Sequence, residues 1–244
     1  MFLTNRDFPL IHDSEIIEWD IRSANTSIME YYGLAEQKLI DKLKELPKQE
    51  REEAVGKLHL KRKGFGKQLE TGFNDIIEEF KEANGLTMDD IVSIKRDAVF
   101  VKNHAIVRSS FGPVVFIPKN TYLHALLLKS YEFYVGKGTV DVKGIADEKV
   151  PLHRDGMILF TKNVLESAFN FRELNRYLKD FMVSYKRREL DFDCYREFTS
   201  DSIFRVNLGG EIMELDDIGE EEMESLDISY NYRNIVLPTL QATF

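Results

Sequence analysis

The stretch that decides the fold is residues 91–101, IVSIKRDAVFV. Apolar residues, many of them β-branched or aromatic, flank a charged triplet that ends in Asp97, and this pattern is typical of a buried strand. Residues 102–103 then predict a turn, and the apolar run at 105–107 would complete a β-hairpin. The sequence therefore predicts a strand that carries one carboxylate in apolar surroundings.

A second acidic residue has a similar setting. Residues 9–22 include Ile16, Trp19 and Ile21 around Asp20 and predict another strand. A carboxylate in a buried strand is costly unless a partner offsets its charge. Two such carboxylates at neighbouring strand ends would hold a pair of Mg²⁺ ions of the kind used in phosphoryl transfer. Alternatively, each aspartate lies at a strand end and only caps the turn that follows.

Helical periodicity fills the region between these two strands. Residues 34–46 and 48–60 predict two helices, and the densest positive cluster of the chain, KRKGFGK at 61–67, follows them. That cluster leads into a longer helical pattern that ends at the Asn84-Gly85 pair. We expect a helical hairpin with a basic return helix, whose charges form either a solvated face or an anion-binding surface.

The chain changes character at Pro151. Further short strands are predicted before it, and two or three helices are predicted within residues 160–198. The expected fold class is therefore α+β, with a mixed region to about residue 150 and a mainly helical region after it.

Composition narrows the class of protein. The 244 residues are 43% hydrophobic and 31% charged, which excludes a disordered chain, and no apolar run is long enough for a membrane helix. The only cysteine, Cys194, fits a reducing compartment, so we expect a cytoplasmic protein. The net charge of −9 means that any grip on nucleic acid must come from a local basic groove or from metal ions.

Five segments carry a family resemblance. They are WDIRSANTSIM at 19–29, SIKRDAVFV at 93–101, KSY at 129–131, VKGI at 142–145 and YNYRNIVLPTL at 230–240. In this order they resemble the D-x-x-S-L-Y-P-S-I, Y-x-D-T-D-S-V-F-V, K-K-x-Y, K-G-[LI] and Y-Y-x-x-x-x-[IV]-L-P-A-L motifs of family B DNA polymerases, the polymerase-alpha-like family.

The resemblance implies a polymerase-like palm with an antiparallel sheet, short helical-hairpin fingers and a mainly helical thumb. The palm would comprise residues 1–33 and 86–150, the fingers 34–85 and the thumb 151–244. The family's N-terminal and exonuclease domains have no counterpart in this length of chain. A small enzyme without proofreading suggests a viral source, with action in the host cytoplasm.

The same resemblance implies a template-directed nucleotidyltransferase that extends a primer 3′-OH. Its partners would be primer–template nucleic acid, nucleoside triphosphates and other replication proteins, with no membrane. Asp20 and Asp97 would be the catalytic carboxylates and, with the carbonyl group of Ile21, would bind two Mg²⁺ ions, for which Mn²⁺ could substitute. The implied nucleotide-binding residues are Ser23, Asn25, Arg62, Lys63 and Lys67, and the implied nucleic-acid-binding residues are Lys129, Tyr131 and Lys143.

Two departures from the family pattern leave alternatives open. The first aspartate of the hairpin motif is Lys95, which would weaken metal binding if its charge offsets the carboxylates. A catalytically inactive, polymerase-like subunit that binds nucleic acid in a replication complex is therefore the alternative function. The tyrosine that excludes ribose in the first motif is Asn25, which predicts tolerance of ribonucleotides.

Overall fold

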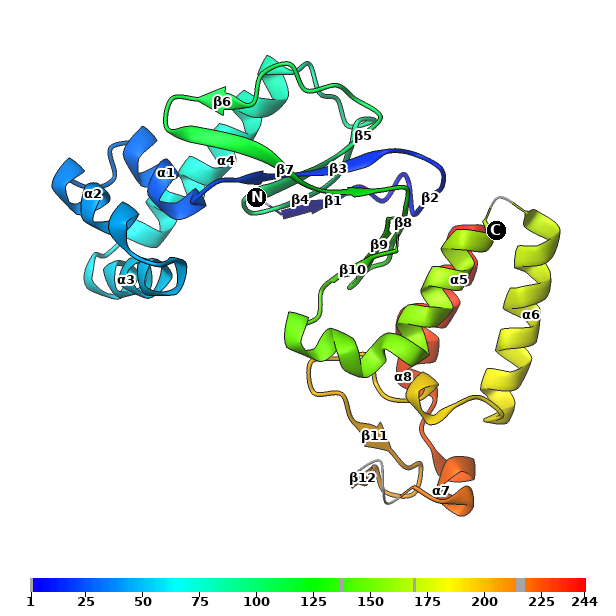
Figure 1. Cartoon of the computed structure of the whole chain (residues 1–244). Coiled ribbons are helices and arrows are strands. Elements are labelled where there is room, and N and C mark those ends of the chain that lie inside the picture. The colour runs from blue at the N-terminus through cyan, green and yellow to red at the C-terminus, as the bar shows by residue number, and fades with distance from the viewer. Residues whose placement is uncertain (1, 137, 169, 214–217) are drawn as a thin grey trace. The chain divides into compact units, whose positions relative to one another are not determined.

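The computed structural model describes residues 2–136, 138–168, 170–213 and 218–244 (Figure 1). The chain divides into two compact units. Unit 1 comprises Met1–Asn5 and Glu15–Thr121, and unit 2 comprises Arg6–Ser14 and Tyr122–Phe244. The segment predicted as fingers, 34–85, lies within unit 1, and the segment predicted as thumb, 151–244, lies within unit 2.

Unit 1 is built on one sheet. Its strand order is β1-β4-β5-β3-β7-β6, and the pairs β1–β4, β4–β5, β3–β5 and β6–β7 are antiparallel. The strands are β1 (Phe2–Thr4), β3 (Ile16–Ile21), β4 (Ile91–Lys95), β5 (Ala98–Lys102), β6 (Ser110–Phe111) and β7 (Val114–Tyr122). The sheet places β3 beside β5, so the two predicted acidic strands are neighbours although about 75 residues separate them in the chain.

The predicted single strand over 91–101 is wrong in one respect. It is a hairpin of β4 and β5, whose two-residue turn is Arg96-Asp97 rather than the expected turn at 102–103. Arg96 adopts a positive φ of 51°, which lets the chain reverse between the paired residues Lys95 and Ala98. Asp97 therefore lies at the tip of a turn rather than inside a strand.

The helices of unit 1 agree with the helical hairpin predicted for residues 34–85. They are α1 (Ala24–Tyr31), α2 (Gln37–Glu45), α3 (Lys48–Lys61) and α4 (Phe65–Ala83). Helix α4 lies along the sheet (Figure 1), and its apolar stripe, which includes Phe73, Ile77 and Phe80, is buried in one core with Ile94 and Val99. The long-range burial of α4 holds the first turn of α1 and the strand ends in fixed places.

Unit 2 contains a second sheet and most of the remaining helices. The sheet has the order β10-β9-β8-β2, with β2 (Leu10–Ile11), β8 (His124–Leu127), β9 (Glu132–Val135) and β10 (Val140–Lys143) paired antiparallel. A small antiparallel pair consists of β11 (Phe204–Arg205) and β12 (Ile212–Met213). The helices are η1 (Asp147–His153), η2 (Arg154–Ile158), α5 (Leu159–Ser167), α6 (Phe171–Arg187), η3 (Phe192–Cys194), α7 (Glu220–Ser225), α8 (Ser229–Asn231), η5 (Tyr232–Val236) and α9 (Leu237–Thr243).

One close approach ties two of the quoted motifs together. Gly144, which follows β10, has a φ of 102°, and a side-chain carbon there would overlap the carbonyl oxygen of Ser130. Only glycine fits this position without moving the Ser130 backbone. The β9–β10 pairing, with Lys143 opposite Glu132, thus brings the KSY and VKGI segments side by side.

The predicted class is confirmed at the level of secondary structure. The protein is a mixed α+β protein with antiparallel sheets, and its later part is mainly helical.

Candidate functional site

A pocket of about 300 Å³ opens in unit 1 at the ends of the central strands. Asp20 and Asp97 both line it, together with the backbone segment that leads into α1. From α3, Lys48 and Arg51 line the pocket with positive charge, and Glu52, whose Oε1 lies 3.9 Å from Nζ of Lys48, adds a third carboxylate. The pocket therefore combines carboxylates, cations and a helix N-terminus within a small volume.

Strand pairing explains why the two aspartates share this pocket. Asp20 is the fifth residue of β3 and is paired with Ala98, the first residue of β5. The backbone N–H of Ile21 donates to the carbonyl oxygen of Asp97 at 3.0 Å. The carboxyl end of β3 is thus bound directly to the hairpin turn, which places both side chains at one edge of the sheet. The carbonyl group of Ile21, a predicted metal ligand, belongs to a residue that also lines the pocket.

The two carboxylates influence each other electrostatically. Burial raises the pKa of Asp97 above its ordinary value, and the negative charge of Asp20 raises it further. Arg96 and Lys119 act in the opposite direction but do not cancel these effects. A carboxylate held in this way gains stability when a cation binds beside it.

Lys119 is the ion-pair partner of Asp20, and it was not predicted from the sequence. Its ammonium lies 3.1 Å from Oδ2 of Asp20 and 3.6 Å from Oε1 of Glu18. Both Lys119 and Glu18 lie on strands that flank each other in the sheet, β7 and β3. The sequence signal for Lys119 was a charged residue in the second half of a strand. Its pairing with Asp20 could not be predicted from the sequence.

The first turn of α1 forms another wall of the pocket. Ser23 precedes the helix with a φ of 51° and makes no side-chain cap, while the hydroxyl group of Thr26 donates to the Ser23 carbonyl oxygen at 2.9 Å. Backbone N–H groups in the first turn of a helix have no partner within the helix. Together with the helix dipole, they favour an anion at this end of α1.

Asn25, the predicted sugar-selecting residue, also lines the pocket. Its Oδ1 accepts a hydrogen bond of 3.3 Å from Nη2 of Arg96, whose guanidinium group stacks 5.0 Å from the ring centroid of Phe73. Arg96 thus bridges the hairpin turn, α1 and α4. The side chain at position 25 is held by this contact rather than by an apolar environment.

The predicted basic cluster of the fingers lies elsewhere in unit 1. Lys67 lines a different pocket, between the end of α1 and α4, with Tyr32 and Gly72. Arg62 donates to the carbonyl oxygen of Leu34 at 3.0 Å, and Lys63 is exposed. The cations that line the aspartate pocket are instead Arg22, which precedes α1, and Lys48 and Arg51 of α3.

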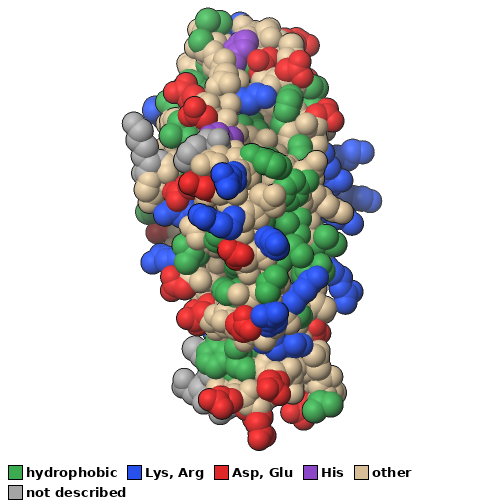
Figure 2. Space-filling model, turned by 90° about the vertical axis from the view of Figure 1, so that its right-hand side faces the viewer, with side chains coloured by type: hydrophobic (Ala, Val, Ile, Leu, Met, Phe, Trp, Pro, Cys, Tyr) green, Lys and Arg blue, Asp and Glu red, His purple; other side chains and the backbone are tan. Residues whose placement is uncertain are grey.

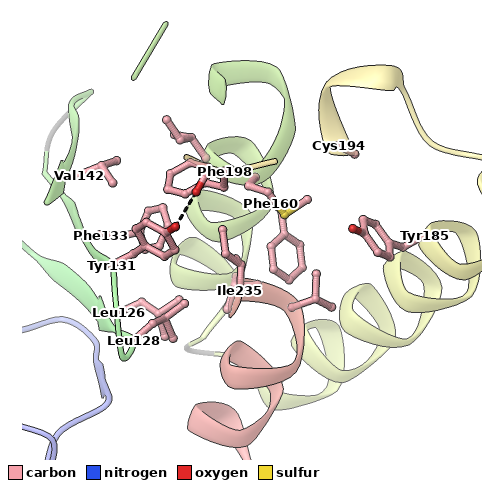
Figure 3. Close-up of a cluster of buried hydrophobic side chains, with 14 of the residues drawn as sticks. Leu126, Leu128, Tyr131, Phe133, Val142, Phe160, Tyr185, Cys194, Phe198 and Ile235 are labelled. Atoms are coloured by element: carbon pink, nitrogen blue, oxygen red, sulfur yellow. Dashed lines mark hydrogen bonds between the residues drawn. The ribbon is translucent and has the colours of Figure 1, made fainter. Parts of the chain in front are cut away.

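The predicted nucleic-acid-binding residues belong to unit 2 and differ in exposure. Lys129 is exposed, and Lys143 forms an ion pair of 2.8 Å with Asp141. Tyr131 is 5% exposed, and its hydroxyl group donates to the carbonyl oxygen of Phe198 at 2.6 Å (Figure 3). Tyr131 therefore serves the core of unit 2 in this structure, and a contact with nucleic acid would require its exposure.

Charge on the surface is mixed rather than uniformly basic. On the face shown in Figure 2, Lys and Arg side chains are interspersed with Asp and Glu, and many of them border a band of hydrophobic side chains. This pattern agrees with the net charge of −9 and with a local rather than a general attraction for anions.

The carboxylates of Asp20 and Asp97 are of a kind that fits Mg²⁺. Asp20 and Asp97 supply hard carboxylate oxygens, the ligands that Mg²⁺ prefers, and Mg²⁺ commonly completes its shell with water and substrate phosphates. In the part of the chain that the structure describes, no group of three or more His, Cys, Asp or Glu residues is arranged to hold a metal ion. The two aspartates therefore fit a sparse site that substrate oxygens complete, and do not form a protein cage.

Comparison with known proteins places the chain in a family. Among the described residues, no helix is long and apolar enough to cross a membrane. No curated protein matches the sequence. The family model described as Bacteriophage PBS1 gene 130 protein matches residues 2–242, and this phage source confirms the viral origin expected from the sequence. Since the match covers nearly the whole chain, the protein belongs to the Bacteriophage PBS1 gene 130 protein family.

Proposed function

We propose that this phage protein is a template-directed nucleotidyltransferase of the family B DNA polymerase type that acts in the host cytoplasm. The observation that carries the proposal is that Asp20 and Asp97, which are distant in sequence, line one pocket at the end of paired strands. The palm would comprise residues 1–33 and 86–150, of which 6–14 and 122–150 belong to unit 2. Helices α2, α3 and α4 would form the fingers, and residues 151–244 would form the thumb.

The pocket has groups suited to each part of a bound nucleoside triphosphate. The first turn of α1 and the α3 cations Lys48 and Arg51 offset the charge of the phosphates. Asp20 and Asp97 would bind two Mg²⁺ ions, with the Ile21 carbonyl group as a further ligand, and such ions stabilise charge on the attacking and leaving oxygens. Arg96 holds Asn25 beside the place expected for the sugar.

Primer extension tests this function directly. The full chain is incubated with a labelled primer–template and dNTPs in Mg²⁺ or Mn²⁺, and rNTPs are supplied in a parallel reaction. We expect extension by the wild-type protein and a loss of at least about a hundredfold in both Asp20→Asn and Asp97→Asn, because each removes a charged metal ligand. Use of rNTPs at a rate comparable to dNTPs is expected from Asn25.

A matched control separates chemistry from folding. Asp89→Asn removes a carboxylate from an exposed turn of unit 1 and should leave extension unchanged. Thermal unfolding of all three variants should show that they remain folded. Extension that persists in both pocket variants would refute the assignment of the aspartates.

A second candidate is a non-catalytic subunit that binds primer–template nucleic acid. It is favoured by the ion pair between Lys119 and Asp20, which already offsets a predicted metal ligand, and by the presence of Lys95 in the hairpin motif. Lys95 itself donates to the hydroxyl group of Thr4 at 3.3 Å. This candidate predicts no extension in either metal, together with nucleic-acid binding that weakens in Lys129→Ala and declines with added salt.

A further inference from the structure

Lys119 lies between two carboxylates of the neighbouring strand. Its ammonium is 3.1 Å from Oδ2 of Asp20 and 3.6 Å from Oε1 of Glu18. The Lys119 side chain is 51% exposed, whereas that of Glu18 is 2% exposed, so the lysine reaches from the surface toward a buried acid. The ammonium group of Lys119 is therefore paired both with Asp20, which lines the pocket, and with Glu18, which is buried.

The two carboxylates have different surroundings. Residues two apart in a strand project from the same face, so Glu18 and Asp20 are adjacent on β3. Glu18 also accepts a hydrogen bond of 2.7 Å from Nδ2 of Asn120, which gives it a partner besides Lys119. Asp20 lines the pocket beside Asp97, where a divalent cation would bind.

We propose that Lys119 is the resident counter-ion of Asp20 and that a divalent cation binds in the pocket only after displacing it. The inference rests on the proposed function because it concerns the same two aspartates. An ammonium and a metal ion compete for the same carboxylate oxygen, and each weakens the binding of the other. Glu18 offers the displaced ammonium a second carboxylate close to its original position.

A consequence is that the pocket has low affinity for a free divalent cation. A cation that arrives with a triphosphate brings additional negative oxygens and competes better for Asp20. The α1 N-terminus and the α3 cations Lys48 and Arg51 would bind those phosphate oxygens. Lys119 thus favours loading of the site by the metal–nucleotide complex over loading by the metal alone.

Calorimetric titration of the full chain with MnCl₂ alone tests this role. The proteins compared are wild type, Lys119→Met and Lys61→Met. Lys61 is exposed at the end of α3, so its replacement changes the net charge equally but removes no contact with Asp20. We expect Lys119→Met to bind Mn²⁺ at least about tenfold more tightly than wild type, and Lys61→Met to bind like wild type.

Two further variants distinguish competition from a structural role. Lys119→Arg keeps the charge and should keep the weak wild-type affinity, while Lys119→Gln loses the charge but keeps a polar group beside Glu18 and should bind tightly. If Lys119→Met does not fold, Lys119→Gln carries the test. Equal affinity in wild type and the folded neutral variants, or no detectable Mn²⁺ binding in any of them, overturns the inference.

The outcome is separable from that of the proposed function. Tighter Mn²⁺ binding in the neutral variants without any primer extension would support Lys119 as the competing cation and refute the polymerase assignment. Extension by wild type with unchanged Mn²⁺ affinity in those variants would refute only the role of Lys119.

Discussion

The aspartate pocket of unit 1 and the buried polar cluster of unit 2 use polar side chains in opposite ways. In unit 2, Asn231 and His153 are almost completely buried and bond to backbone groups at and next to Phe198. In unit 1, Asp20 and Asp97 lie beside open space and repel each other. Motif matches occur in both regions, but two neighbouring carboxylates beside open space mark only the first as a candidate site.

The largest effect on stability is expected from Asn231→Ala. The amide oxygen accepts from the N–H of Phe198 at 2.9 Å, and the amide nitrogen donates to the carbonyl oxygens of Cys194 and Arg196 at 3.0 and 2.8 Å. Leaving these buried groups without partners should reduce the free energy of unfolding by about 3 kcal/mol. Urea denaturation measures this loss.

A neighbouring asparagine provides the matched control. The side-chain amide of Asn234 donates to the carbonyl oxygen of Tyr230 at 2.9 Å, at a partly buried position. Asn234→Ala should therefore cost about 1 kcal/mol or less. Equal losses in the two variants would contradict the structural role given to Asn231.

The next largest expected effect is that the stability of unit 2 depends on pH through His153. Burial lowers the pKa of His153 from 6.5 to about 4, and its Nε2 lies 3.0 Å from the hydroxyl oxygen of Ser202. Because the folded state disfavours the protonated form, the stabilisation is fully present above pH 6.5 and is lost as the pH falls toward 4. The loss should reach about 3 kcal/mol and is measured by denaturation at a series of pH values.

Replacement of the histidine tests its share of that dependence. In His153→Gln, stability should change much less between pH 6.5 and 4 than in wild type, although it will be lower at neutral pH. An unchanged slope in this variant would assign the pH dependence to other groups.

A smaller effect on stability is expected to distinguish Tyr131, which is buried, from Lys129, which is exposed. Both were predicted to contact nucleic acid. Tyr131→Phe removes the hydroxyl group that donates to Phe198 and contacts Tyr230 at 2.9 Å, so it should reduce the free energy of unfolding by roughly 1–2 kcal/mol. Lys129→Ala, at an exposed position, should leave stability within about 0.5 kcal/mol and weaken nucleic-acid binding only. Denaturation measures the stability of both variants, and fluorescence anisotropy measures their binding to nucleic acid. Weaker nucleic-acid binding without loss of stability in Tyr131→Phe would contradict a role of Tyr131 in the core.

The smallest expected effect is a gain in the stability of unit 1 on replacement of Asp97. Burial and Asp20 raise the pKa of Asp97, so the unfolded chain loses this proton first and stability falls as the pH rises above the ordinary value of 3.8. Asp97→Asn avoids that penalty and should be more stable than wild type at neutral pH by under about 1 kcal/mol. The difference should vanish at low pH, and a destabilised variant at pH 7 would argue against repulsion at this site.

Local sequence was enough to predict much of the architecture. The periodicity of 34–46, 48–60 and the pattern ending at Asn84-Gly85 corresponds to α2, α3 and α4. The apolar runs around Asp20 and Asp97 became adjacent strands. The apolar pattern did not predict the turn at Arg96-Asp97, because a positive φ at arginine has no strong sequence signal, although the resemblance to the family's hairpin motif implied one. The α+β class followed from these local patterns.

The sequence by itself therefore determined most of the helices and strands of unit 1 and the two acidic residues beside apolar runs, since periodicity and burial cost are properties of nearby residues; the strand expected at 105–107 does not form. Only the tertiary structure decided that Asp20 and Asp97 line one pocket, that Lys119 is paired with Asp20, and that Arg22 and α3 rather than Lys67 supply the pocket's cations. These arrangements depend on strand order and on which helix end reaches the sheet edge, and neither is encoded in the spacing of any one segment.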